Sequence, residues 1–97
     1  MQEVLLEEYT NGQQVFIIKD GQKKLGEMVI AISGDLMTVY HTEVFGEAEG
    51  KGLGTDLLNA MVDHARKFNL KVIPLCVFVL AQFKRHPGLY EDVWQKK

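Results

Sequence analysis

The sequence has 97 residues, with 11 basic and 13 acidic side chains and a formal net charge of −2. Mixed charges of this kind argue against a nucleic-acid partner, which usually requires a basic face. The longest apolar run, residues 72–81, contains Pro74 and is too short to span a membrane. The length predicts one domain over residues 1–97. A monomer or weak dimer is expected. One cysteine and a start without a signal-peptide pattern indicate a cytoplasmic protein.

The first 45 residues predict an antiparallel meander, because apolar and polar side chains alternate between turn residues. We expect strands over residues 4–9, 15–19, 24–33 and 36–45. Asn11-Gly12, Asp20-Gly21 and Gly34-Asp35 separate these runs, since Asn, Asp and Gly tolerate positive φ. Strict alternation in the last strand places Met37, Val39, His41, Glu43 and Phe45 on one face.

After Gly52 the apolar spacing changes to that of a helix, with a stripe formed by Leu53, Leu57, Leu58, Met61, Val62 and Ala65. This helix should end near Asn69, which can adopt the left-handed conformation after a helix. Residues 70–76 predict a buried strand and residues 81–85 a second helix. His86-Pro87-Gly88 should interrupt it before a last helical turn or two over residues 89–95. The predicted fold class is α+β, a meander followed by strand, helix and a strand that can run parallel.

Three glycines, Gly50, Gly52 and Gly54, precede the first helix. The first amides of a helix have no partner within it, and its dipole adds partial positive charge there. Glycines let an anion approach the backbone closely, so such a turn can hold a phosphate. The spacing alone is equally consistent with an ordinary flexible turn. A P-loop is excluded because Gly-Lys-Ser/Thr is absent, and a preceding meander argues against a dinucleotide fold.

Four short segments occur in an order that resembles a known family. They are His41-Thr42-Glu43-Val44, residues 49–54, Pro74-Leu75-Cys76 and Arg85-His86-Pro87. With them the chain resembles the minimal GNAT-like acetyltransferases over roughly residues 25–94. The resemblance implies the GNAT-like acyl-CoA N-acyltransferase fold, in which two parallel strands splay apart. Glu49 departs from the Arg or Gln of the wider GNAT superfamily, and Val77 from the proline common in the subgroup.

The resemblance also implies acetyl-CoA as co-substrate and places it along this chain. The pantetheine arm is expected to pair with the backbone of Val44, Phe45 and Gly46. The pyrophosphate is expected to bind the backbone of Gly50, Lys51, Gly52, Leu53, Gly54 and Thr55. Arg85 is expected to contact a phosphate of CoA. Alternatively, Arg85 only complements the dipole at the end of its helix.

Transfer of an acetyl group to an amine requires removal of a proton from the amine and protonation of the leaving thiolate. Cys76 is a candidate covalent carrier of the acetyl group, and the alternative is a buried inert thiol. His41 and Glu43 are candidate bases, since an imidazole titrates near neutrality and both residues precede the glycine turn. Alternatively, His41 packs beneath the helix and Glu43 is solvated or fixes the loop.

The sequence therefore predicts an N-acetyltransferase that binds acetyl-CoA and acetylates a small-molecule or protein amine, with Cys76 as a candidate carrier. The first alternative is a non-catalytic acyl-CoA-binding module. The second is a structural or adaptor domain with an ordinary glycine turn. No metal is expected, because His41, His64 and His86 show no metal-ligand spacing. Neither a nucleic acid nor a membrane is expected as partner.

Overall fold

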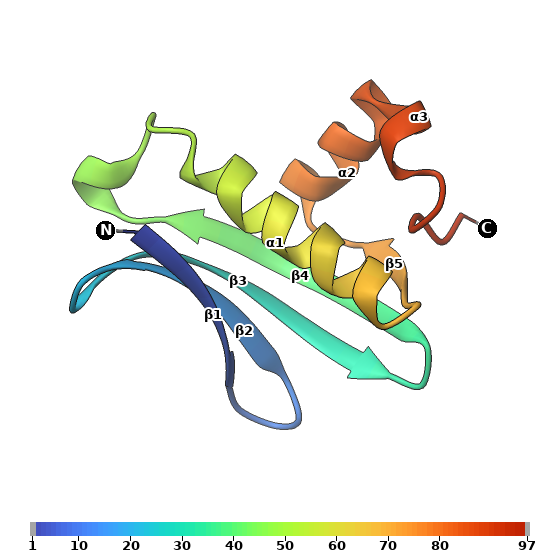
Figure 1. Ribbon diagram of the computed structural model, residues 1–97, viewed down its shortest axis with the longest axis horizontal. Coiled ribbons are helices and arrows are strands. Elements are labelled where there is room, and N and C mark those ends of the chain that lie inside the picture. Colours follow the sequence, from blue (N-terminus) through green and yellow to red (C-terminus); the bar gives the residue numbers. More distant parts are fainter. Residues whose placement is uncertain (1, 97) are drawn as a thin grey trace.

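The computed structural model describes residues 2–96, which form a five-stranded sheet with helices on one face (Figure 1). The strands are β1 (Gln2–Glu8), β2 (Gln14–Asp20), β3 (Lys23–Ser33), β4 (Leu36–Val44) and β5 (Lys71–Pro74). The helices are η1 (Gly46–Ala48), α1 (Leu53–Lys67), α2 (Val77–Arg85) and α3 (Pro87–Tyr90). Strands β1 to β4 are antiparallel neighbours and β5 runs parallel to β4, which confirms the predicted α+β class. No helix within residues 2–96 is long and apolar enough to cross a membrane.

The core lies between the sheet and the apolar stripe of α1. Met28, Ile30, Met37 and Val39 of the sheet are fully buried against this layer, as are the α1 residues Leu57 and Met61. Each such side chain contributes ~1.5–3 kcal/mol by leaving water. The predicted stripe is confirmed, and the helix ends near Asn69, whose φ is 55°. This packing holds the first turn of α1 beside the end of β4.

A β-bulge at Tyr40 reverses the faces of the sheet to which the later side chains of β4 point. Ile30 of β3 lies opposite Val39, whereas Val29 lies opposite His41, so Tyr40 is an extra residue. Beyond it, Thr42 lies opposite the core residue Met28 and therefore shares the helix-covered face. The strict alternation expected from the sequence is wrong for this reason, since one inserted residue turns every later side chain to the other face.

Strands β4 and β5 separate after four paired positions. Pairing runs from Leu36 opposite Lys71 to Val39 opposite Pro74. The amide of Leu75 then donates to the carbonyl of Ile73, which turns the chain away from β4 and into α2. Residues 40–44 of β4 have no β5 partner among the residues described. The expected splayed pair of parallel strands is therefore present.

The C-terminal segment differs from its predicted helix. Helix α3 begins at Pro87, a position that suits the first turn of a helix. It ends at Tyr90, and Trp94 then lies beside Val72 of β5. The amide of Val72 donates to the carbonyl of Val93, and that of Gln95 donates to the carbonyl of Val72. The helix expected to reach residue 95 is wrong beyond Tyr90, because this pairing satisfies backbone groups at the outer edge of β5.

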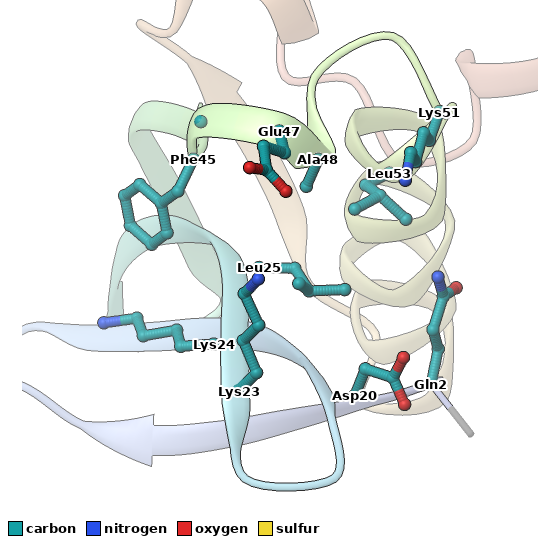
Figure 2. A pocket seen from close by; sticks show the side chains of 11 residues that line it. Gln2, Asp20, Lys23, Lys24, Leu25, Phe45, Glu47, Ala48, Lys51 and Leu53 are labelled. Carbon is teal, nitrogen blue, oxygen red and sulfur yellow. The ribbon is translucent and has the colours of Figure 1, made fainter.

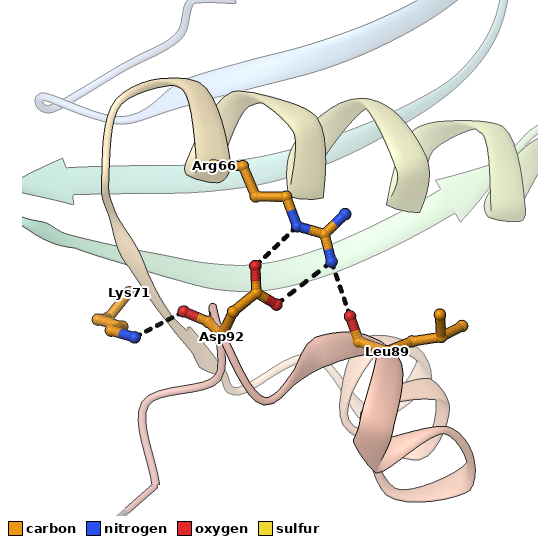
Figure 3. Close-up of polar contacts among 4 residues, drawn as sticks. All are labelled: Arg66, Lys71, Leu89 and Asp92. Atoms are coloured by element: carbon orange, nitrogen blue, oxygen red, sulfur yellow. Dashed lines mark hydrogen bonds and ion pairs between the residues drawn. The ribbon is translucent and has the colours of Figure 1, made fainter.

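Arg66 of α1 forms hydrogen bonds to the C-terminal segment that follows α3 (Figure 3). Its Nε donates to Oδ2 of Asp92 at 2.9 Å, and its Nη2 donates to the carbonyl of Leu89 at 2.7 Å. Lys71 adds a hydrogen bond from Nζ to the carbonyl of Asp92. The Arg66 guanidinium holds the pKa of the Asp92 carboxyl below its usual range, chiefly through its hydrogen bond.

Asp92→Asn is expected to destabilise the fold by at most ~1 kcal/mol near neutral pH, because the pair is exposed. A carboxyl with a lowered folded pKa adds stability above its unfolded value, and this is lost as pH falls through the folded value. The difference between Asp92→Asn and wild type in urea unfolding should therefore shrink in acid. An unchanged difference below the folded pKa would contradict the assignment.

Candidate functional site

The turn between β4 and α1 presents a run of free backbone amides. The amides of Phe45, Ala48 and Glu49 donate to the carbonyls of Leu25, Phe45 and Gly46, respectively. The next amide with a backbone partner is that of Asp56, which donates to the carbonyl of Gly52. Within residues 2–96, no hydrogen bond is made by the six amides from residue 50 to residue 55. These six are the amides expected to bind a pyrophosphate.

Gly50 and Gly52 give the turn its shape. Their φ angles are 83° and 76°, a left-handed conformation that side chains rarely adopt. A Cβ at either position would meet nothing within 4 Å. Both glycines are therefore required by the backbone, and the space beside them is open to a ligand.

Gly54 has a different role from the phosphate contact expected of it. It lies in the first turn of α1, and a Cβ there would stand 3.2 Å from Cζ of Phe78 in α2. Its missing side chain allows α2 to approach α1. The amide of Gly54 still belongs to the free run, so a phosphate contact through the backbone stays a prediction.

A hollow of about 380 Å³ adjoins the turn (Figure 2). Lys23 from the start of β3 and Lys51 from the turn lie on two sides of it, and Glu47 points into it from η1. Leu25 and Phe45 contribute apolar surface. Lys23, Lys24 and Lys51 line the hollow together with the acidic residues Asp20 and Glu47, which leaves a small excess of positive charge. This excess favours an anion near the turn.

Arg85 lies far along α2 from the turn. The contact between Phe78 and Gly54 sets the start of α2 against α1, and Arg85 is the last residue of α2. Seven residues of helix separate Phe78 from Arg85, or ~10 Å along the axis. Lys51 is therefore better placed than Arg85 to contact a phosphate bound at the turn.

Cys76 lies where β4 and β5 separate. Its amide donates to the carbonyl of Val39 at 2.9 Å, and it is the N-cap residue of α2. The residue is 5% exposed, and Sγ lies 3.3 Å from Oγ1 of Thr42. Thr42 was not identified from the sequence, because only the bulge at Tyr40 turns it toward Cys76. Val44, Phe45 and Gly46 continue from this point toward the glycine turn.

His41 and Glu43 meet on the other face of the sheet. Nε2 of His41 lies 3.9 Å from Oε1 of Glu43 and 4.0 Å from Oε2 of Glu27. His41 and Glu43 are about half exposed. The alternative in which His41 packs beneath the helix is therefore wrong. Glu27 was missed in the sequence, but it lies directly opposite Glu43 in the β3–β4 register.

Glu27, His41 and Glu43 are also a set that could hold a metal ion. One ligand atom from each lies within 4.8 Å of the other two. Nζ of Lys24 lies 2.8 Å from Oε1 of Glu27, so an ammonium already offsets one of the two carboxylates. The absence of a metal stays a prediction.

Comparisons with known proteins agree with the fold described above. The model of a family described as GCN5-related N-acetyl-transferase matches residues 14–93. A search of curated protein sequences finds no match. Among solved structures, the chain is similar to a GCN5-like N-acetyltransferase of Staphylococcus aureus. The two share 28% identity with a TM-score of 0.67, over 98% of this chain and 89% of that one.

Two more distant structures share the fold. A ribosomal-protein-alanine N-acetyltransferase of Brucella melitensis is 16% identical with a TM-score of 0.63, over 90% of this chain and 64% of that one. A Bacillus subtilis acetyltransferase in complex with CoA is 13% identical with a TM-score of 0.68, over 88% of this chain and 74% of that one. At these identities the similarity shows the architecture alone.

Proposed function

The chain belongs to the GCN5-related N-acetyltransferase family, and from this premise we propose that it transfers an acetyl group from acetyl-CoA to a primary amine. The observation that carries the proposal is the run of six free amides at residues 50–55, which opens at the end of the splayed β4 edge. Amides at a helix N-terminus bind phosphate groups through hydrogen bonds and the helix dipole. Lys51 adds positive charge there.

The proposed position of the thioester depends on the edge of β4 that β5 leaves unpaired. Within the part of the chain that the structure describes, residues 40–44 have no strand partner on the β5 side, so their backbone groups are free to bind an extended arm. Val44, Phe45 and Gly46 are the proposed contacts of the pantetheine. A pantetheine arm that lies along this edge, starting at the glycine turn, would bring the thioester toward Thr42 and Cys76. Holding the thioester and the amine together at this point supplies much of the rate.

In the direct route, the amine nitrogen attacks the thioester carbonyl, and the carbon–sulfur bond breaks. The amine proton passes to His41 or Glu43, and the CoA thiolate leaves and takes a proton from solvent water. Both side chains lie on the helix-free face, so the amine enters the split between β4 and β5 from that face. Glu27 and Glu43 attract its ammonium form there.

Cys76 offers a second route within the same function. Its thiolate attacks the thioester carbonyl, CoA leaves as a thiol, and the amine then takes the acetyl group from Cys76 Sγ. The Thr42 hydroxyl beside Sγ supports this route, since it can donate a hydrogen bond to a thiolate. A reducing cytoplasm, which keeps a lone thiol free, is the proposed compartment.

Cys76→Ala is expected to retain acetyl-CoA binding and to lose turnover if the acetyl group passes through Sγ. Mass spectrometry of wild type quenched in acid should then show one acetyl group on Cys76, and none in the variant. Thr42→Val, which keeps volume but removes the hydroxyl, should reduce the adduct. Full turnover in Cys76→Ala would contradict the covalent route and leave the direct one.

A non-catalytic acyl-CoA-binding module is the second candidate function. It is favoured by one observation: His41 and Glu43 lie on the face opposite the Cys76 side chain. Acceptors to be tested are small-molecule amines, such as polyamines, and peptides with lysine or a free N-terminus. Binding of acetyl-CoA without transfer to any of them would favour the module.

A further inference from the structure

Three large apolar residues lie exposed around the point where β4 and β5 separate. Tyr40 is 40% exposed, Leu75 61% and Val77 81%. They are three of the six large apolar residues that are exposed within residues 2–96. Single exposed apolar residues are ordinary on a protein surface, whereas a group of them indicates a surface that binds a ligand or partner. These three residues are called the apolar rim.

Backbone pairing with β4 brings the residues of the apolar rim together. Val39 is the last residue of β4 that pairs with β5, and its partner is Pro74. The carbonyl of Val39 also accepts a hydrogen bond from the amide of Cys76 at 2.9 Å. Each residue of the rim is the chain neighbour of Val39 or of one of these two partners. The rim therefore borders the split at which the two strands part.

The apolar rim adjoins the polar group on the helix-free face of the sheet. Tyr40 directly precedes His41, and three residues of strand, or ~10 Å, separate it from Glu43. The carboxylate of Glu27 is already paired with Lys24, whose Nζ lies 2.8 Å from Oε1. This pairing leaves the carboxylate of Glu43 to attract a further positive charge. A ligand that satisfies both surfaces is positively charged at one end and apolar at the other.

We propose that the acceptor is a primary monoamine with an extended alkyl or aromatic group, which binds its ammonium at Glu43 and its apolar group on the rim. The inference rests on the proposed function, and it names the class of amine. A polyamine fits less well, because its far ammonium would lose water against apolar side chains. A short amine fits less well, because it reaches Glu43 without covering the rim.

Hexylamine and cadaverine form a matched pair of acceptors for the test. The two chains have the same length, but cadaverine carries a second ammonium where hexylamine ends in a methyl group. Hexylamine is expected to be acetylated with a kcat/KM about tenfold or more above that of cadaverine, because only its far end is apolar. Shortening the alkyl chain toward propylamine should lower kcat/KM by up to about fourfold for each methylene removed.

Replacing a residue of the rim should change the preference between these amines. Leu75→Ser is expected to raise the KM for hexylamine by about tenfold, because the alkyl chain loses an apolar contact. The kcat for hexylamine and the kcat/KM for cadaverine should stay unchanged. Leu89→Ser is the matched control, because Leu89 is the same residue type, is 60% exposed and lies in α3. Val77→Ser provides a second rim variant, and circular dichroism checks the folding of all three.

Binding of the amines, followed by NMR titration with and without CoA, separates this inference from the proposed function. Tighter binding of hexylamine than of cadaverine, lost in Leu75→Ser, would support the rim even if no amine were acetylated, and that result would contradict the transferase. Equal kcat/KM for both amines, in wild type and in Leu75→Ser, would overturn the inference and leave the transferase. Neither binding nor acetylation of hexylamine would overturn both.

Sedimentation of wild type and Leu75→Ser tests whether a second copy of the chain covers the rim instead. We expect the same sedimentation behaviour from both proteins, because the rim is open to the acceptor. A dimer that Leu75→Ser dissociates, with amine kinetics unchanged, would overturn the inference.

Discussion

Gly52→Val is expected to weaken acetyl-CoA binding by about 10- to 150-fold, because one charge-assisted hydrogen bond of ~1.5–3 kcal/mol is lost. Gly52 has a φ of 76° and caps α1, and a β-branched residue resists this conformation. The valine therefore moves the neighbouring amides out of line with the phosphates. Titration calorimetry of the folded variant measures the loss.

A matched control for Gly52→Val exists in the β3–β4 hairpin. Gly34 has a φ of 61° and, like Gly52, open space where a Cβ would stand. It precedes β4, whereas the glycine turn follows it, so nine residues or ~30 Å of strand separate the two. Gly34→Val should strain the backbone similarly and leave acetyl-CoA affinity unchanged. Equal affinity losses in both variants would show that the effect comes from general destabilisation.

The second large effect is expected at the helix-free face. Replacing the general base with an isosteric or neutral residue should lower kcat by about 100- to 10,000-fold and leave acetyl-CoA affinity intact. His41→Gln and Glu43→Gln test the two candidates separately. The variant that also abolishes the pH dependence of kcat identifies the base. Glu7→Gln, an exposed acid on β1, is the control.

Wild-type kcat in both His41→Gln and Glu43→Gln would contradict a role for either as base. Transfer would then depend on holding the amine and the thioester together, with water taking the proton. Raised KM with unchanged kcat would instead show that these side chains bind the amine without taking its proton.

Local patterns in the sequence account for the elements that were predicted well. The apolar stripe of α1 needs only a helical period, and the hairpin turns need only Asn, Asp and Gly at their positions. The position of the glycine turn between β4 and α1 follows from these two signals. The unpaired amides in the first turn of α1 could therefore be expected before the structure, whereas the full range 50–55 was implied only by the family resemblance.

The parts that were missed depend on neighbouring strands. The bulge at Tyr40 is a property of the β3–β4 pairing, and it decides that Thr42, and not His41, shares the face of Cys76. Glu27 joins His41 only through the register of the same pair. The pairing of Trp94 with Val72 likewise arises from an available strand edge. No period within one segment encodes these long-range contacts.

Amine-dependent release of CoA is the measurement that tests the proposed acetyl transfer most directly. Purified protein is mixed with acetyl-CoA and a panel of primary amines, and free CoA thiol and acetylated amine are measured together by mass spectrometry. We predict that both products form in equal amounts with at least one amine and that Gly52→Val suppresses both. Binding of acetyl-CoA with no product from any amine would contradict the transferase, and no binding at all would contradict the acyl-CoA site.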